Sequence, residues 1–470
     1  MKKLLSILFI IITFKAHSQD ESILKRPKID KRTELLSIVF RLAEAREYSS
    51  NAFPLYVDKI NAHFIPYKKH PLIRFVKSDV IGKNFVGYDA VMKMAIQITD
   101  PPGMEPIVPF TNELPDKRWG KENANKFLKL LNQFYTDAKC EEFFQSNEAL
   151  YEEASRRFGL VYDELDLKWY KDFYGQQPKG EFRIVIGLGN GGGNYGPNIV
   201  MPDGKDIIYA IMGAYTTDST GMAVFKIHQY FPTLLHEFNH SFVNHLVEKH
   251  HPELKKSGKK NFKPVKDLMI SQAYGGWQTM YAESMVRASV IKYLEDHKSK
   301  KRDEELTEEI SRGFIWTDKL VAKLNEYDQN RKEYPSLESF MPEIIKFFDQ
   351  TAFEIYELNR QVNNKRPQIL DFYPFDNNAK NVDPSIKELV LTMDKNISEL
   401  NLWISRSYND NKTYPEAENI TFDSETKKLK IEFKKLEANT SYQFKLRQWA
   451  IKTEEGYGIN DYTVSFDTSK

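Results

Sequence analysis

The chain has 470 residues, of which 41% are hydrophobic and 28% charged, a mixture typical of globular proteins with more than one domain. Lys and Arg together number 67 and Asp and Glu 66, so the bulk charge argues against a nucleic-acid-binding protein. The single cysteine, Cys140, excludes disulfide bonds within the chain, and we expect it to be a small buried residue.

The first residues have the pattern of a signal peptide. Lys2 and Lys3 precede a largely apolar run, residues 4–14, which is too short to span a bilayer comfortably. Ala16 and Ser18 then provide small residues for cleavage before Gln19, which predicts a signal peptide over residues 1–18; an uncleaved membrane anchor is the alternative. No later segment has eighteen consecutive apolar residues, so we expect no transmembrane segment in an exported mature chain, which would be periplasmic, cell-surface or extracellular.

The first third of the mature chain has helical periodicity. Apolar residues recur at the spacing of one helix face from Glu34 to Ala43, and a similar pattern continues over residues 89–98. A third helical pattern covers residues 120–157. This part is therefore predicted to be mainly helical.

Strand formers appear near Glu181. Residues 182–188 and 206–215 are predicted strands, separated by a segment rich in Gly and Asn. Long helical patterns follow, at roughly 221–250, 268–298, 304–328 and 335–364, with a basic stretch (255–266) between the first two.

The glycine-rich segment after the first strand formally matches a dinucleotide-binding fingerprint at Gly187–Gly192. The residues that follow, 193–197, cannot open the helix that this fingerprint needs, which argues against a bound nucleotide. Two readings remain open: a flexible loop between strands, or an edge to which an extended peptide binds through main-chain hydrogen bonds.

The composition changes again at Arg366. Apolar and polar residues alternate in three runs, 429–433, 442–446 and 462–467, which is typical of strands in a small antiparallel sandwich. This part looks like a bacterial immunoglobulin-like module, and the resemblance is carried by residues 436–442 and 462–468. The predicted organisation is therefore a signal peptide (1–18), a mainly helical domain with a small mixed sheet (19–365, with its core at about 180–300) and a β-sandwich domain (366–470), an α+β fold class.

The motif His236-Glu237-Phe238-Asn239-His240 lies in one of the predicted helices. Residues four apart on a helix lie about 40° apart around its axis and one turn apart along it, so both imidazoles can reach one cation. A carboxylate beside such a pair, here Glu237, has the position of a general base for water on zinc. The alternative is a helix that carries two histidines with structural roles.

A catalytic zinc site needs a third protein ligand. His245 lies on the opposite side of the helix from His236, and Val243 and Leu246 exclude the metzincin arrangement. Glu283 lies in the middle of an otherwise apolar helical segment, where a buried carboxylate needs a partner. That partner is either the metal or Arg287, four residues later, in a salt bridge.

The motif with a downstream helical Glu283 resembles the gluzincin metallopeptidases. This resemblance implies a zincin-like fold with Zn²⁺ held by His236, His240 and Glu283, Glu237 as the general base, and a peptide or protein substrate. The 42 residues between His240 and Glu283 (241–282) exceed the separation in the best-known gluzincins. The region also looks like an uncharacterised family of exported bacterial zincin-like proteins, on the basis of residues 34–38, 236–244 and 282–287.

Further residues are candidates for support of this site. Asn244 lies near the histidine face, and Arg287 is placed to support Glu283. Tyr281 is one of three tyrosines, with Tyr215 and Tyr274, that are candidates for an oxyanion stabiliser or a substrate contact. The sequence does not choose among the tyrosines. Besides a peptidase, it leaves open a zincin-fold binding or adhesion protein without turnover, and a hydrolase of a non-peptide amide.

Overall fold

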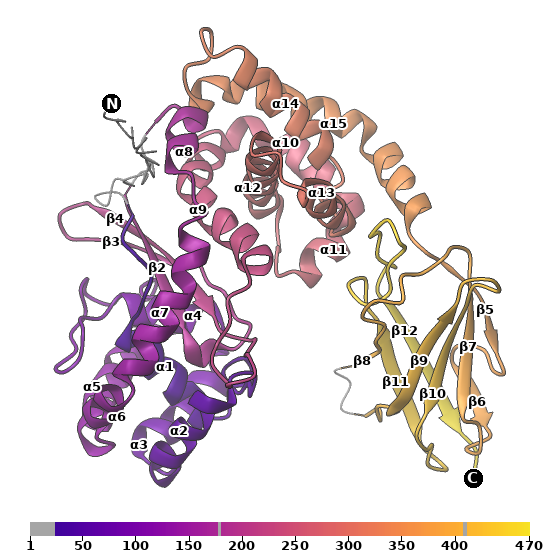
Figure 1. Cartoon of the computed structure of the whole chain (residues 1–470), viewed down its shortest axis with the longest axis horizontal. Coiled ribbons are helices and arrows are strands. Elements are labelled where there is room, and N and C mark those ends of the chain that lie inside the picture. Colours follow the sequence, from indigo (N-terminus) through magenta and orange to yellow (C-terminus); the bar gives the residue numbers. More distant parts are fainter. Residues whose placement is uncertain (1–23, 177–179, 408–410) are drawn as a thin grey trace, which may run out of the picture. The chain divides into compact units, whose positions relative to one another are not determined.

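The computed structural model describes residues 24–176, 180–407 and 411–470 (Figure 1). The signal peptide predicted at residues 1–18 lies outside them. The described residues form two compact units, the first from residues 24–172 and 180–241, the second from residues 173–176 and 242–470. The predicted boundary between residues 365 and 366 falls inside the second unit. No helix in these described ranges is long and apolar enough to cross a membrane.

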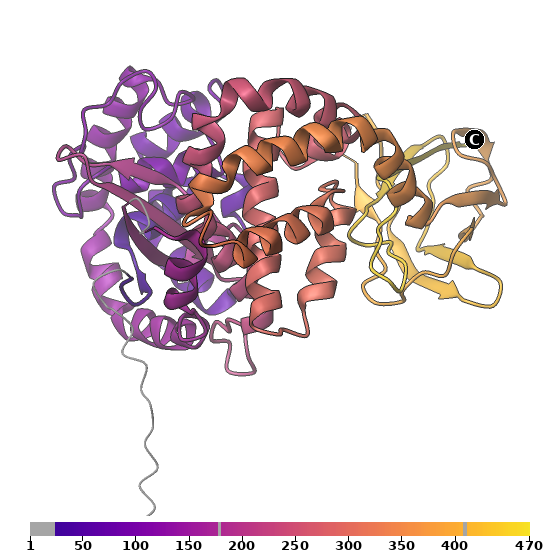
Figure 2. The same cartoon turned by 90° about the horizontal axis from the view of Figure 1, so that it is seen from above.

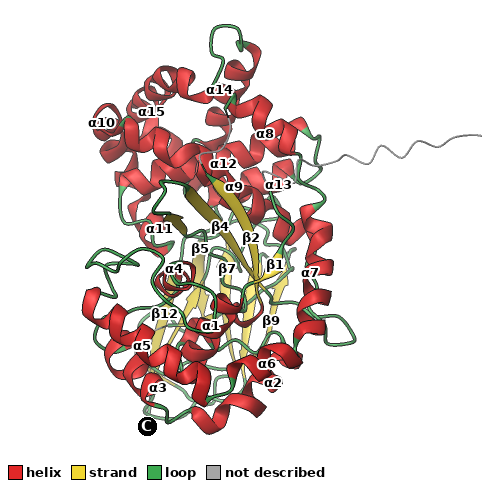
Figure 3. Cartoon of the chain, turned by 90° about the vertical axis from the view of Figure 1, so that its left-hand side faces the viewer, coloured by secondary structure: helices red, strands yellow, loops and turns green. Residues whose placement is uncertain are grey.

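A small mixed sheet organises the first unit, and its order is β1-β2-β4-β3. β1, β2 and β4, which Figure 3 labels, are parallel. β3 pairs antiparallel with β4 and lies at the edge. Both predicted strands are present as β2 and β4. The strands are β1 (Lys28–Ile29), β2 (Glu181–Gly187), β3 (Asn198–Val200) and β4 (Asp206–Gly213).

The predicted helical regions of the first unit are helical, with additional breaks, whereas the helices over 54–64, 71–75 and 167–174 were not predicted. The predicted helix over 120–157 is three helices, because Lys139 is left-handed (φ 51°) after α5 and Asn147 leaves helical geometry after α6. Cys140 is buried, as predicted. The helices are α1 (Lys31–Leu42), α2 (Pro54–Phe64), α3 (Pro71–Phe75), α4 (Asp89–Ile96), α5 (Lys121–Asp137), α6 (Cys140–Ser146) and α7 (Glu148–Tyr162), together with α8 (Leu167–Tyr174) and α9 (Ile227–Lys249), which begin in this unit and end in the second.

The second unit begins with helices. The basic stretch that the sequence analysis placed between two helices is itself mostly helical, in α10, because its lysines lie on a solvated face while Leu254 and Asn261 are buried. The predicted helix over 304–328 is two helices, separated at Gly313, whose φ of +108° favours glycine. The helices are α10 (His251–Phe262), α11 (Lys266–Ser271), α12 (Trp277–Asp296), α13 (Arg302–Ser311), α14 (Thr317–Gln329) and α15 (Leu337–Lys365).

The C-terminal strands of the second unit form two four-stranded sheets, with the orders β5-β7-β10-β9 and β6-β12-β11-β8 (Figure 2, yellow). The predicted alternation holds: Tyr442, Phe444 and Leu446 of β11 are buried in an apolar core. The chain is thus a mixed α+β protein with a strand-rich C-terminal region. The strands are β5 (Ile369–Tyr373), β6 (Ala379–Val382), β7 (Glu388–Met393), β8 (Ser405–Arg406), β9 (Ala417–Asp423), β10 (Lys428–Phe433), β11 (Ser441–Leu446) and β12 (Tyr462–Thr468).

Candidate metal centre

Helix α9 carries the histidine pair. It begins at Ile227, and Pro232 lies inside it. An apolar stripe along it is buried, at Leu235, Phe238, Phe242 and Leu246. Phe238 packs on Phe182 of β2, with ring centroids 4.3 Å apart, which fixes this part of α9 against the sheet.

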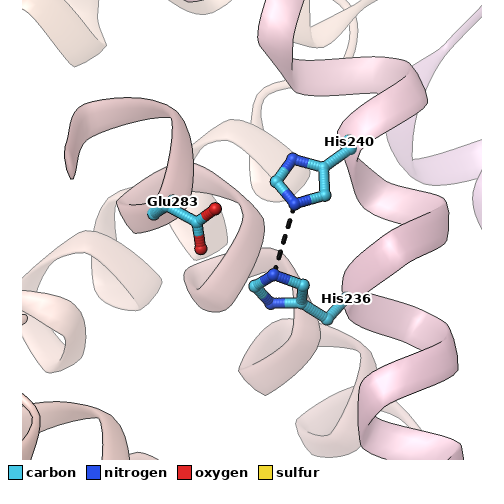
Figure 4. Close-up of side chains that lie close together, drawn as sticks. All are labelled: His236, His240 and Glu283. Carbon is cyan, nitrogen blue, oxygen red and sulfur yellow. Dashed lines mark hydrogen bonds between the residues drawn. The ribbon is translucent and has the colours of Figure 1, made fainter. Parts of the chain in front are cut away.

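The two imidazoles converge. The Nε2 atoms of His236 and His240 lie 3.2 Å apart, and the ring planes make an angle of 84° (Figure 4). Two nitrogens that bind one tetrahedral zinc at 2.0–2.1 Å would be about 3.3 Å apart. The spacing of the pair therefore suits two ligands of one zinc ion.

Glu283 completes a group of three possible metal ligands. One ligand atom of each of His236, His240 and Glu283 lies within 4.8 Å of the others. Figure 4 shows the Glu283 carboxylate turned toward the imidazole pair. Glu283 comes from the middle of α12 and is only 7% exposed, as expected for a carboxylate with a dedicated partner. Two neutral imidazoles and one carboxylate are a donor set that zinc takes in catalytic sites, so these residues fit the metal.

Arg287 supports Glu283, and it has a second acidic partner. Its Nη2 lies 3.2 Å from Glu283 Oε2, whereas its Nη1 lies 2.5 Å from Glu309 Oε2 on α13. Burial alone would lower the pKa of Arg287, but the charges of Glu309 and Glu283 outweigh it and raise the pKa. Because Glu309 makes the shorter contact, the Glu283 carboxylate is not the sole counterion of Arg287.

Tyr274 is the tyrosine that the structure brings to this group. Its hydroxyl accepts a hydrogen bond from Arg287 Nη2 at 2.9 Å. Burial raises the pKa of Tyr274 to about 12; the negative charge of Glu283 adds to the rise and the charge of Arg287 opposes it. At neutral pH Tyr274 therefore keeps its proton and remains a hydrogen-bond donor.

The other candidates are placed differently. Tyr281 is fully buried, stacks on Phe348 with ring centroids 3.9 Å apart and accepts a hydrogen bond from Asn261, so its contacts are those of a core residue. Tyr215 stacks on Tyr230 at 5.0 Å. Asn244 lies one turn after His240 on α9 and is exposed.

Glu237 faces the segment that leads into the edge strand. A Cβ added to Gly196 would lie 2.0 Å from Glu237 Oε2, so the backbone at Gly196 is in direct contact with the carboxylate.

Gly196 and Glu309 were not predicted from the sequence as residues of this site. Gly196 is one of several glycines in its segment, and Glu309 is one of several acids in α13, so neither had a signal that singled it out.

Comparisons with known proteins identify both parts of the chain. Residues 27–347 match the family described as "Domain of unknown function (DUF4932)", and residues 363–468 match the "Bacterial Ig-like domain" family. No curated protein matches the chain.

Two solved structures of a surface-layer protein are weakly similar, at 13% sequence identity and a TM-score of 0.18 each, values too low to support an argument. The match to the structure of surface layer protein SbsC, domains 1-6, covers 55% of this chain and 35% of that protein chain. The match to the S-layer protein rSbsC(31-844) covers 73% of this chain and 41% of that protein chain. This chain therefore spans less than half the length of each of the two matched chains. The DUF4932 match covers well over half of the sequence, and the chain therefore belongs to this family of unknown function and ends in a bacterial Ig-like domain.

Proposed function

We propose that the chain is an exported zinc-dependent peptidase of the gluzincin type, with a zincin-like catalytic domain. The observation that carries this proposal is the grouping of His236, His240 and Glu283 within 4.8 Å, with Glu237 next to the first histidine. His236, His240 and Glu283 would hold the metal. Zinc, when bound, supplies Lewis-acid chemistry that polarises a carbonyl and makes a water molecule more acidic.

The chain's own residues take the remaining roles. Glu237 removes a proton from the attacking water and passes it to the leaving amine, the usual work of a general base next to a zinc site. Arg287 of α12 holds the Glu283 carboxylate in place, and Tyr274 in turn accepts a hydrogen bond from Arg287. Support of this kind keeps a ligand oriented while substrate exchanges.

The edge strand β3 is the proposed place for an extended peptide. It is the last strand in the order of its sheet, and Asn198 and Val200 are exposed while Ile199 is buried. An extended peptide can pair with such an edge through main-chain hydrogen bonds. Gly196, directly before β3, contacts Glu237, so a peptide on this edge would pass the proposed base.

The test compares purified wild type with Glu237→Gln, for zinc content and for cleavage of a broad peptide library. Glu248→Gln is the matched control, because Glu248 is an exposed acid of the same helix. We expect all three proteins to bind one zinc ion. Cleavage should fall by roughly 10²–10⁴-fold in Glu237→Gln alone, and a chelator should abolish it in wild type until zinc is restored.

Three results would overturn parts of this proposal. If the wild-type protein binds no zinc, the proposed metal centre is wrong. If it binds zinc but cleaves no peptide, the proposed peptidase activity is wrong, and a zincin-fold binding or adhesion protein of the cell envelope is favoured. Undiminished cleavage by Glu237→Gln removes Glu237 as the base.

A further inference from the structure

The glycine segment, which we define as residues 187–196, joins β2 to the edge strand. Both open readings from the sequence, a flexible loop and an edge for peptide, concern this segment. It leaves β2 through a 3₁₀ turn (Leu188–Asn190) and returns to the sheet at Tyr195, which exchanges two backbone hydrogen bonds with Ile211 of β4, at 2.9 and 2.8 Å. The segment is therefore attached to the sheet at both ends.

Its glycines are required by close packing. A Cβ added to Gly189 would lie 2.7 Å from Ser37 Cβ, and one added to Gly191 would lie 2.4 Å from Ser50 Cβ. Distances this short are far inside van der Waals contact, so no larger residue fits without movement of its neighbours. Gly192 differs, because an added Cβ meets nothing within 4 Å. Close contact with neighbouring side chains excludes the flexible-loop reading for the packed positions.

Two side chains of α1 hold the segment. Both oxygens of Glu34 accept backbone N–H groups, from Leu188 at 2.6 Å and from Gly189 at 3.2 Å. Ser37 Oγ lies 2.6 Å from the side-chain oxygen of Asn190. Glu34 and Asn190 are fully buried, so these contacts are shielded from water, and burial raises the pKa of Glu34 to about 7 despite the two amide donors.

The far end of the segment contacts the proposed base. The 2.0 Å distance from an added Cβ of Gly196 to Glu237 Oε2 means that the carboxylate occupies the space that any other residue would fill. Glu237 is a long side chain that can rotate, so a methyl group at position 196 would displace its carboxylate and leave the backbone in place. The energetic cost to folding should be small, whereas the effect on the position of the carboxylate should be large.

We propose that the glycine segment is a fixed support that sets the position of the Glu237 carboxylate, with Glu34 as the positioning residue that anchors the support to α1. The inference rests on the proposed function in one respect, since it takes Glu237 to be the base. The structural part of the inference is that the contact with Gly196 sets the position of the Glu237 carboxylate. This part does not depend on whether Glu237 is the base.

The experiment pairs Gly196→Ala with Gly192→Ala. Both variants add one methyl group to the same segment, and neither position has a left-handed φ, but only the first meets Glu237. Crystal structures should show the Glu237 side chain rotated in Gly196→Ala and unchanged in Gly192→Ala, with equal zinc affinity in both. On a cleaved peptide, kcat should fall about 100-fold in Gly196→Ala with little change in KM, because a displacement of about 1 Å costs that much.

Glu34→Gln tests the anchor. It keeps the size of the side chain and replaces one acceptor oxygen by a donor, so Leu188 or Gly189 loses its partner. Amide hydrogen exchange at residues 188–190 should accelerate at least about tenfold, and kcat should fall while zinc affinity stays unchanged.

An unmoved Glu237 carboxylate in Gly196→Ala, or unchanged amide exchange in Glu34→Gln, would overturn the inference. If wild type with bound zinc cleaves no peptide, the proposed function fails, and the crystal structures and exchange rates still decide whether the glycine segment positions Glu237.

Discussion

The C-terminal sandwich and the region around the candidate metal centre bury very different side chains. The sandwich core consists of residues such as Leu389, Leu391, Leu429 and Phe444, with one tyrosine, Tyr442, among its fully buried members. Helices α12 and α13 instead bury Glu283, Arg287 and Glu309, and α1 buries Glu34. Buried charges cost free energy unless they are paired, whereas an apolar core achieves the same packing without them. The buried charges of α12 and α13 are paired with one another, whereas the sandwich core needs no such pairing.

The largest expected effect follows from removal of Arg287. Arg287→Met removes the cation that the buried carboxylates of Glu283 and Glu309 share, and leaves Glu309 with Arg312 at 3.6 Å. It should lower the free energy of unfolding by about 3–5 kcal/mol at neutral pH. Urea denaturation at pH 7 measures it.

The matched variant in the sandwich is Leu391→Ala. It creates a cavity in an apolar core and should cost about 2–5 kcal/mol in the same measurement. The comparison between the two regions fails if Arg287→Met lowers the free energy of unfolding much less than Leu391→Ala does.

The next largest effect is the contribution of Glu34 to the pH dependence of the free energy of unfolding. Its pKa is raised from 4.5 to about 7 by burial, so the folded chain retains a proton that the unfolded chain releases between these values. The stabilisation is fully present below pH 4.5 and is lost as the pH rises through 7, a loss of about 3 kcal/mol. Glu34→Gln should remove this slope from a plot of unfolding free energy against pH.

Glu305 of α13 is the control for Glu34, because burial also raises its pKa to about 7. Glu305→Gln should remove a similar slope and leave the amide exchange of residues 188–190 unchanged. Identical pH curves for wild type and Glu34→Gln would show that Glu34 is not held as the structure describes.

The smallest effect concerns the second partner of Arg287. In Glu309→Gln, Arg287 retains Glu283 as its one close charged partner among the described side chains and should draw that carboxylate away from the histidines. Zinc affinity should fall about 10–100-fold, as for other residues that orient a metal ligand. Zinc titration by calorimetry measures it. Glu308→Gln, which loses contacts to Arg312 and Lys452 only, should bind zinc as wild type does.

Local patterns predicted much of the fold. The strands β2, β4, β10, β11 and β12 and the helices α9, α12 and α15 have apolar spacing that depends on neighbours in sequence, so they could be identified from the sequence. α2, α3, α8 and α10 were not identified. The sequence of α10 predicts a basic connecting stretch, because its many lysines leave too few apolar residues to form a recognisable helical pattern.

The sequence by itself determined the spacing of His236 and His240, the position of Glu237 beside them and the alternation of the C-terminal strands. Helix and strand geometry alone fix these relations, because they act over four residues or fewer. Only the tertiary structure decided which tyrosine accepts a hydrogen bond from Arg287, that Glu309 shares Arg287, and that Gly196 contacts Glu237. These contacts join residues 13 to 41 positions apart, and no local pattern records which of many similar residues will meet once the chain has folded.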